Sequence, residues 1–335
     1  MLEAVLQFLV AAALIVVAGT FLTRYADAIA DLTGFGRLLV GSILLAGATS
    51  LPELTVDISA VRLGNPDLAV GDLMGSSLFN LLILAFLDLS RKSRGRMFSH
   101  AVVAHALSAT ASILLAALAA TAILLAPRLT GAALGSVGLG TIAIIVAYAF
   151  CIRLIFYDQR VSAQHSEAAE QEVLIPAGGL KLWQASLGFA VAAAVIVATG
   201  PFLAEAADEL AELSGLGGTF VGTTLVALCT SLPELVACIT ALRMGAFDLA
   251  VGNIFGSNAF NMVLLFPLDL VHASPVLASV SPNHAITALA TVVVTSVAIM
   301  GQLYQVEKRI RFLEPDAALV IVLVMAVLGA LYYLR

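Results

Sequence analysis

Long apolar stretches alternate with short polar segments along the whole chain, and apolar runs of roughly twenty residues recur. A helix of about 20 apolar residues can cross the hydrocarbon core of a bilayer. Ten membrane-spanning helices are therefore predicted, five on each side of a long polar segment at 158–181. Their expected bounds are 4–23, 36–60, 67–89, 100–126, 132–157, 182–204, 216–241, 248–271, 284–304 and 316–334.

The composition agrees with this pattern and excludes other classes of protein. Hydrophobic residues make up 61% of the chain and charged residues 11%, whereas soluble domains carry about 25% charged residues. The basic residues form no long run interleaved with aromatic residues, so no nucleic-acid partner is expected. The cysteines show no CxxC pairing, and Cys229 and Cys238 are interpreted as buried inert thiols. The expected fold class is an all-α integral membrane protein.

The two halves of the chain repeat each other. Moving the chain by 181 residues places Thr49 on Thr230 and Glu53 on Glu234. The same shift places "DLAVGDLMGSSLFN" (67–80) on "DLAVGNIFGSNAFN" (248–261), and no gap is needed from residue 8 to residue 89. A duplication of one five-helix unit therefore accounts for the chain.

An odd number of spans in each half requires the second half to enter the membrane from the opposite side. If both termini lie outside, the inside positions hold 13 of the 16 Lys and Arg residues, as cytoplasmic loops usually do. The expected loop 24–37 is basic, whereas its equivalent, 205–218, is acidic. We therefore predict two inverted-topology five-helix repeats, 1–157 and 182–335, joined by a cytoplasmic linker at 158–181.

The sequence TSLPE occurs once in each half, inside an apolar run. A carboxylate is costly inside a membrane and usually marks function, while Pro disrupts the helical hydrogen bonds. Pro52 is expected to kink its helix and to loosen carbonyl oxygens at 46–48. Thr49 and Glu53 are four residues apart and should share a face, as should Ser76 and Asn80.

These groups and their repeat equivalents are predicted to form one oxygen-rich site near the midplane, where inverted-repeat transporters bind substrate. Carboxylate, hydroxyl, amide and carbonyl oxygens suit Ca²⁺ or Na⁺ rather than a soft transition metal. Two carboxylates would neutralise one divalent cation. The candidate ligands are Ala46, Thr49, Ser50, Glu53, Ser76, Asn80, Ala227, Thr230, Ser231, Glu234, Ser257 and Asn261.

The paired motifs resemble the two alpha-repeats of sodium/calcium exchangers in the cation/Ca²⁺ antiporter superfamily. TSLPE occurs in both halves and is followed by GSSLFN or GSNAFN, within alpha-repeats at 36–89 and 216–271. The resemblance implies ten helices with both termini outside and exchange of Ca²⁺ for Na⁺ by alternating access. It also implies that the candidate ligands line one Ca²⁺ site and flanking Na⁺ sites, and that the first and sixth helices are sliding gates.

The chain departs from the family pattern at several positions. Asn261 stands where many exchangers carry Asp, and Asp72 replaces a common Asn. Asp72 could share a face with Ser76, but the favoured interpretation is a carboxylate hydrogen-bonded near a helix end. The histidines are interpreted as interfacial residues outside the repeat-related face; they are His100, His105, His272 and His284.

A proton-coupled Ca²⁺ or other divalent-cation antiporter is the nearest alternative. Proton-coupled relatives generally carry G-N-x-x-E at the acidic helix, whereas this chain places hydroxyls there, so Na⁺ is favoured as the coupling ion. Protons should still compete with Ca²⁺ for a glutamate in a low-dielectric environment.

Two alternatives come from other functional classes. A cation channel would need continuous pore rings, and an intramembrane enzyme would need a motif such as HExxH, which the chain lacks. We expect a non-enzymatic antiporter without a cofactor, acting as a monomer in the plasma (inner) membrane. Its substrates would be Ca²⁺ and Na⁺, with H⁺ in the alternative mechanism, and lipid would surround it.

Overall fold

The computed structural model describes residues 2–90, 101–128, 133–167, 180–213, 228–303 and 315–334. This part of the chain is almost entirely helical, apart from a two-stranded antiparallel hairpin. The elements are α1 (Leu2–Thr33), α2 (Arg37–Val40), the π-helical turn η1 (Gly41–Leu45), α3 (Ala46–Thr49), α4 (Leu51–Arg62), α5 (Pro66–Ser90), α6 (Ala101–Leu125), the 3₁₀ turn η2 (Ala126–Arg128), β1 (Ala133–Leu134), β2 (Val137–Gly138), α7 (Leu139–Glu167), α8 (Leu182–Leu213), α10 (Leu232–Arg243), α11 (Phe247–Val271), α12 (Val276–Ser279), α13 (Asn283–Leu303) and α14 (Pro315–Leu334).

Seven of the described helices are long and apolar enough to cross a membrane, and a bent pair, Arg37–Thr49 with Leu51–Arg62, raises the number to as many as eight. A shorter apolar helix, Asp316–Leu331, lies within α14. The predicted span 216–241 falls partly outside the described residues. The all-helical, multi-span architecture is thus confirmed, and the count of ten spans stays a prediction.

Several predicted span ends are wrong because helices continue beyond the apolar core. α1 extends to Thr33 and α8 to Leu213, so most of the expected loop 24–37 is helical. Arg37 forms ion pairs with Asp27 and Asp31 of α1. These pairs neutralise charged residues that, in the sequence, are typical of a loop. α7 likewise continues to Glu167, into the expected linker.

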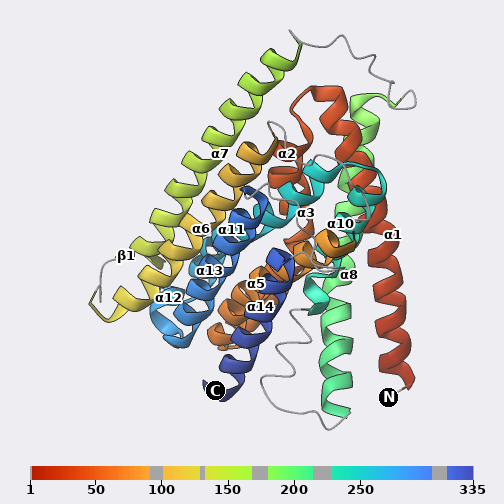
Figure 1. Ribbon diagram of the computed structural model, residues 1–335. Helices are drawn as coiled ribbons and strands as arrows, with labels where there is room; N and C mark the ends of the chain where they lie inside the picture. Colours follow the sequence, from red (N-terminus) through yellow and green to blue (C-terminus); the bar gives the residue numbers. More distant parts are fainter. Residues whose placement is uncertain are drawn as a thin grey trace.

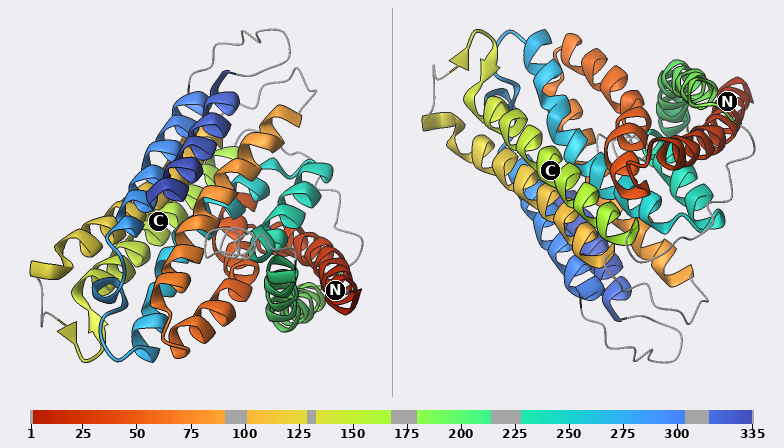
Figure 2. Two further views of the ribbon diagram at one scale, coloured as in Figure 1. Left: turned by 90° about the horizontal axis from the view of Figure 1, so that it is seen from below. Right: turned by 90° about the horizontal axis from the view of Figure 1, so that it is seen from above.

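Equivalent helices α1 and α8 run antiparallel along each other (Figure 1). The Gln7 amide donates to the Phe202 carbonyl at one end of the pair, and Gly188 lies against the Tyr25 ring at the other. In both views of Figure 2 this pair stands at one edge of the bundle. The start of α1 and the end of α14 lie at the same end of the molecule (Figure 1).

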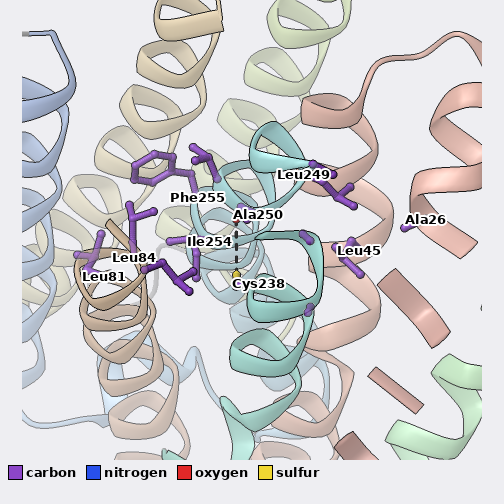
Figure 3. Packing of buried hydrophobic residues seen from close by; sticks show 14 of the residues in the cluster. Ala26, Leu45, Leu81, Leu84, Cys238, Leu249, Ala250, Ile254 and Phe255 are labelled. Atoms are coloured by element: carbon purple, nitrogen blue, oxygen red, sulfur yellow. Dashed lines mark hydrogen bonds between the residues drawn. The ribbon is translucent and has the colours of Figure 1, made fainter. Parts of the chain in front are cut away.

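The centre of the molecule is formed by α5 and α11. Of their apolar stretches, 72% and 67% of the residues are buried, compared with 28% in α1 and 22% in α7. Phe255 and Ile254 of α11 join Leu81 and Leu84 of α5 in one apolar cluster (Figure 3). Charged or polar groups in these two helices are therefore enclosed by protein.

Glycine allows α11 to cross the η1 region at backbone contact. A Cβ on Gly252 would lie 2.6 Å from the Leu38 carbonyl oxygen, and one on Gly41 would lie 2.6 Å from the Leu249 carbonyl oxygen. Real Cβ atoms essentially never approach so closely. This crossing brings the polar face of α11 against the segment that carries TSLPE.

Candidate cation site

The helix that carries the first TSLPE is broken at Ser50. α3 ends at Thr49 and α4 restarts at Leu51, with a bend of 41° between the two parts of the span. Ser50 has φ −88° and ψ 6°, which departs from helical geometry. Pro52 lies in the first turn of α4, where its missing N–H breaks no bond within that helix. Glu53 follows in the same turn, where the helix dipole favours a negative charge.

The break does not release the carbonyl group of Ala46, contrary to the prediction. Its oxygen accepts a hydrogen bond from the Ser50 N–H at 3.0 Å and also lies 3.2 Å from Thr49 Oγ1, whose single proton can go to it or to the Asn253 side-chain oxygen. The carbonyl that loses its helical donor is that of Ala48, because Pro52 has no N–H.

The second half has the same local geometry. Ser231 precedes α10 with φ −79° and ψ 3°, and Pro233 again lies in the first helical turn, followed by Glu234. The equivalence of the two TSLPE segments therefore extends from sequence to backbone. Ala227, the predicted partner of Ala46, lies outside the described residues.

Amide side chains join α5 and α11 where the two helices cross. The Asn80 amide donates to the Asn258 side-chain oxygen at 3.0 Å, and the Asn258 amide donates to the Ser77 carbonyl at 3.2 Å. The Asn261 amide donates to the Leu73 carbonyl at 3.4 Å. Asn80 and Asn261 use their N–H groups in these contacts, so their side-chain oxygens remain available to a ligand.

Hydroxyl groups from both halves surround Glu234. Ser50 and Ser257 donate to its Oε1 at 3.3 and 3.4 Å. The Thr49 hydroxyl lies 3.4 Å from that of Ser257 and donates to the Asn253 side-chain oxygen at 3.3 Å. One glutamate of the second half is thus held by the broken helix of the first.

A second set of contacts surrounds Thr230. Its hydroxyl lies 3.5 Å from that of Ser76 and donates to Asp72 Oδ1 at 3.4 Å. Asp72 is 2% exposed. The interpretation of Asp72 as a helix-end carboxylate is therefore wrong, because it faces the candidate site.

Among the described residues, several buried oxygen atoms of the site find no hydrogen-bond donor. They are Glu53 Oε2, Glu234 Oε2, Asn80 Oδ1, Asn261 Oδ1 and Ser231 Oγ. Buried polar atoms nearly always have a partner, so a group of unpaired acceptors indicates that something outside the chain satisfies them. The buried polar side chains of the described residues include one histidine, His105, and no lysine or arginine. A bound cation is the group that fits these acceptors.

The predicted side chains that the structure describes are each at most 2% exposed. Three contacts join the two halves among them, namely Thr49 with Ser257, Ser50 with Glu234 and Ser76 with Thr230. Three polar side chains that were not predicted also lie there: Asn253, Asn258 and Asp57. Asp57 could have been found, because it lies four residues after Glu53 and therefore on the same helix face. Asn253 could have been found in the same way, because it lies four residues before Ser257, whereas the contact of Asn258 with Asn80 crosses from one half to the other.

Two Asp–His pairs occupy equivalent places outside the site. His284 Nε2 lies 2.9 Å from Asp67 Oδ1, and His105 Nε2 lies 2.9 Å from Asp248 Oδ1. Asp67 and Asp248 are repeat equivalents, whereas His105 and His284 do not occupy equivalent positions in the sequence. His100 lies outside the described residues.

Comparison with known proteins places this geometry in a family. A family model described as "Sodium/calcium exchanger protein" matches residues 3–157 and 185–333. Inner membrane protein YrbG from Escherichia coli K12 is 28% identical over 271 residues, which cover 80% of this chain and 79% of YrbG. Sodium/calcium exchanger MaX1 from Methanosarcina acetivorans is 45% identical over a shorter stretch of 76 residues, 23% of this chain.

The fold is also shared with a solved exchanger structure. A structure of the sodium-calcium exchanger NCX_Mj superposes with a TM-score of 0.70 over 97% of both chains, at 16% sequence identity. That likeness shows the common fold, and the family model covers both halves of the chain. This multi-pass membrane protein therefore belongs to the sodium/calcium exchanger family, whose members are cation/Ca²⁺ antiporters.

Proposed function

We propose that this protein exchanges Na⁺ for Ca²⁺ across the membrane by alternating access. The observation that carries the proposal is the pair Glu53 and Glu234, buried at 1% and 0% exposure among hydroxyl and amide oxygens. The two carboxylates come from opposite halves and match the charge of one Ca²⁺. Ca²⁺ takes six to eight oxygen ligands, and the surrounding side chains supply the remainder.

The proposed ligands are side chains from both broken helices and from both central helices. Because the Ala46 carbonyl already accepts the Ser50 N–H and Ala227 lies outside the described residues, the proposal rests on side-chain oxygens. These side chains are Thr49, Ser50, Glu53, Ser76, Asn80, Thr230, Ser231, Glu234, Ser257 and Asn261. Na⁺ and Ca²⁺ would compete for the two glutamates.

The gates are proposed to be α1 and α8, which correspond to the first and sixth predicted spans. A Cβ on Gly200 of α8 would lie 2.6 Å from Pro52 Cβ, and one on Gly19 of α1 would lie 3.0 Å from Val236 Cγ1. Gly19 and Gly200 are repeat equivalents. Each gate helix thus passes, through a glycine, over the broken helix of the opposite half, and movement of a gate would change access to a glutamate.

The proposed topology is two inverted five-helix repeats in the plasma (inner) membrane. Both termini would lie outside, and the 158–181 segment would lie in the cytoplasm. The antiparallel pairing of α1 with α8 supports inversion, because equivalent helices of parallel repeats would run in the same direction. The excess of positive residues at the inside positions supports the orientation.

A proton-coupled antiporter is the second candidate, because buried carboxylates can carry protons in place of Na⁺. The hydroxyls of Ser50 and Ser257 on Glu234 favour Na⁺, since a proton needs only the carboxylate whereas Na⁺ needs several oxygens.

The test is uptake of ⁴⁵Ca²⁺ into proteoliposomes loaded with Na⁺, compared with liposomes loaded with choline and with an imposed pH gradient. Uptake that depends on internal Na⁺ is expected. Uptake that follows the pH gradient alone would move the protein to proton coupling. Absence of uptake under either gradient would contradict Ca²⁺ as the substrate.

A further inference from the structure

A second pair of buried carboxyl groups adjoins the proposed site. Asp57 lies on α4, one turn beyond Glu53, and Asp72 lies on α5. The equivalent side chains of the second half, Cys238 and Asn253, touch each other, so the two carboxyl groups are neighbours. Asp57 is 0% exposed and Asp72 is 2% exposed. Four carboxyl groups are therefore enclosed in this part of the protein, whereas one Ca²⁺ balances only two.

The Asp57–Asp72 pair lacks the donors that a buried carboxylate requires. Both side-chain oxygens of Asp57 and Oδ2 of Asp72 accept no hydrogen bond from the part of the chain that the structure describes. Two ionised carboxylates offer each other only acceptors. Among the described ion pairs, none involves either residue. A fully buried, unpaired charge is expensive, so a cation from outside the chain is required when both groups are ionised.

Asp269 shows how this protein treats a buried carboxylate that has a structural role. It is also 0% exposed, but its oxygens accept hydrogen bonds from the backbone N–H groups of Val276 at 2.7 Å and Gly138 at 2.9 Å. The carboxylate thereby joins a helix start to the β-hairpin. Asp57 has no comparable donors, so a structural role of this kind does not account for it.

The equivalent positions in the second half carry a neutral pair. Cys238 occupies the position equivalent to Asp57, and Asn253 occupies the position equivalent to Asp72. The Asn253 amide donates to Cys238 Sγ at 3.6 Å, and the Cys238 thiol donates to the Ala250 carbonyl at 3.7 Å (Figure 3). The same backbone arrangement is therefore satisfied without charge in one half. The backbone arrangement therefore does not require the charges of Asp57 and Asp72.

We propose that Asp57 and Asp72 form a further Na⁺ site, linked to the main site through Thr230. The Thr230 hydroxyl contacts both Asp72 and Ser76, so one side chain touches both sets of ligands. The oxygens in reach are those of two carboxylates and one hydroxyl. This set is smaller than the six to eight ligands of Ca²⁺, and hard oxygen ligands exclude a soft metal. A monovalent hard cation fits these ligands, and it balances the single negative charge that is left when the two carboxyl groups share one proton.

This inference rests on the proposed exchange function, and its test uses a double substitution. Asp57→Cys with Asp72→Asn installs in the first half the pair that the second half already accommodates, so the variant should fold. Asp67→Asn is the matched control, because it removes a carboxylate from the same helix as Asp72 but from outside the site. Na⁺-dependent ⁴⁵Ca²⁺ flux in proteoliposomes and the Na⁺-induced rise in Tm of the purified protein are both measured.

The double variant should show a lower Hill coefficient for Na⁺ and require about tenfold more Na⁺ for half-maximal Ca²⁺ flux. Its Tm in Na⁺-free buffer should be higher than that of the native chain and should rise less with added Na⁺. An unchanged Hill coefficient and an unchanged Na⁺-induced Tm shift would overturn the proposal. A variant altered only in its response to pH would also overturn it.

The failure of the exchange function is distinguishable from the failure of this site. If the native chain transports no Ca²⁺, the exchange function fails, whereas the Na⁺-induced Tm shift still tests the Asp pair without any transport. If the native chain transports Ca²⁺ and the double variant equals it in both measurements, only the further site fails.

Discussion

The two broken-helix segments have nearly the same backbone but carry different charges. Ser50 and Ser231 adopt matching dihedral angles, and each is followed by Leu-Pro-Glu at a helix start. One turn later the first half has Asp57 where the second has Cys238. The duplication has thus preserved the shape of the site while allowing its electrostatics to differ on the two sides. Substitutions at equivalent positions test how far each side depends on charge.

The largest effect is expected where the halves are identical. Glu53→Gln or Glu234→Gln should each reduce Ca²⁺ flux by more than about 100-fold, because even indirect partners of a metal ligand cost about 10- to 100-fold. ⁴⁵Ca²⁺ uptake in proteoliposomes measures this, with the exposed Glu3→Gln as control. Near-native flux in either glutamine variant would refute the central assignment.

The next effect comes from making the halves more alike. Cys238→Asp with Asn253→Asp should destabilise the protein in cation-free buffer by about 3–5 kcal/mol, because it buries charge without a partner and removes the thiol's bond to Ala250. Added Na⁺ should restore part of the lost Tm in thermal unfolding. Equal Tm values for variant and native chain in cation-free buffer would show that this region tolerates charge without a cation.

A smaller difference is expected between the two gate glycines. Gly200→Ala would bring its Cβ 2.6 Å from the Pro52 Cβ and 3.3 Å from the Pro52 Cα, so the clash involves a rigid ring and backbone. Gly19→Ala would meet the Val236 side chain at 3.0 Å, which can rotate away. Overpacking typically costs about 1–3 kcal/mol. Gly200→Ala should therefore lower Tm and transport rate more than Gly19→Ala, and the reverse order would contradict the proposed contact.

The smallest effect is expected at the Asp–His pairs. The His105 side chain is 5% exposed and that of His284 is 17% exposed. Loss of a more buried hydrogen bond costs more, so Asp248→Asn should lower stability by about 1 kcal/mol and Asp67→Asn by less. Thermal unfolding of the two variants side by side measures the difference, and equal losses would mean that burial does not distinguish them.

Much of the fold could be predicted from the sequence because hydropathy and the repeat act over whole segments. The break at TSLPE also follows from local chemistry, since Pro52 has no N–H to donate. The extra turns of α1 could not be predicted, because Asp27 and Asp31 resemble a loop until Arg37 is placed beside them. Contacts such as Thr49 with Asn253 depend on how the two halves pack against each other. They cannot be predicted from the sequence of either half alone.

Pro52 has two structural roles, one in the broken helix and one in the contact with α8. Its ring ends the hydrogen bonding of the helix before Glu53, and the same ring lies against Gly200 of α8. A substitution at Pro52 would alter ion affinity and gate movement together, so evolution could not adjust one without the other on this side of the molecule. On the opposite side α1 rests mainly on Val236, a side chain distinct from the helix-breaking Pro233. Natural variation in gating speed should therefore accumulate on the α1 side, while the α8 side stays constrained.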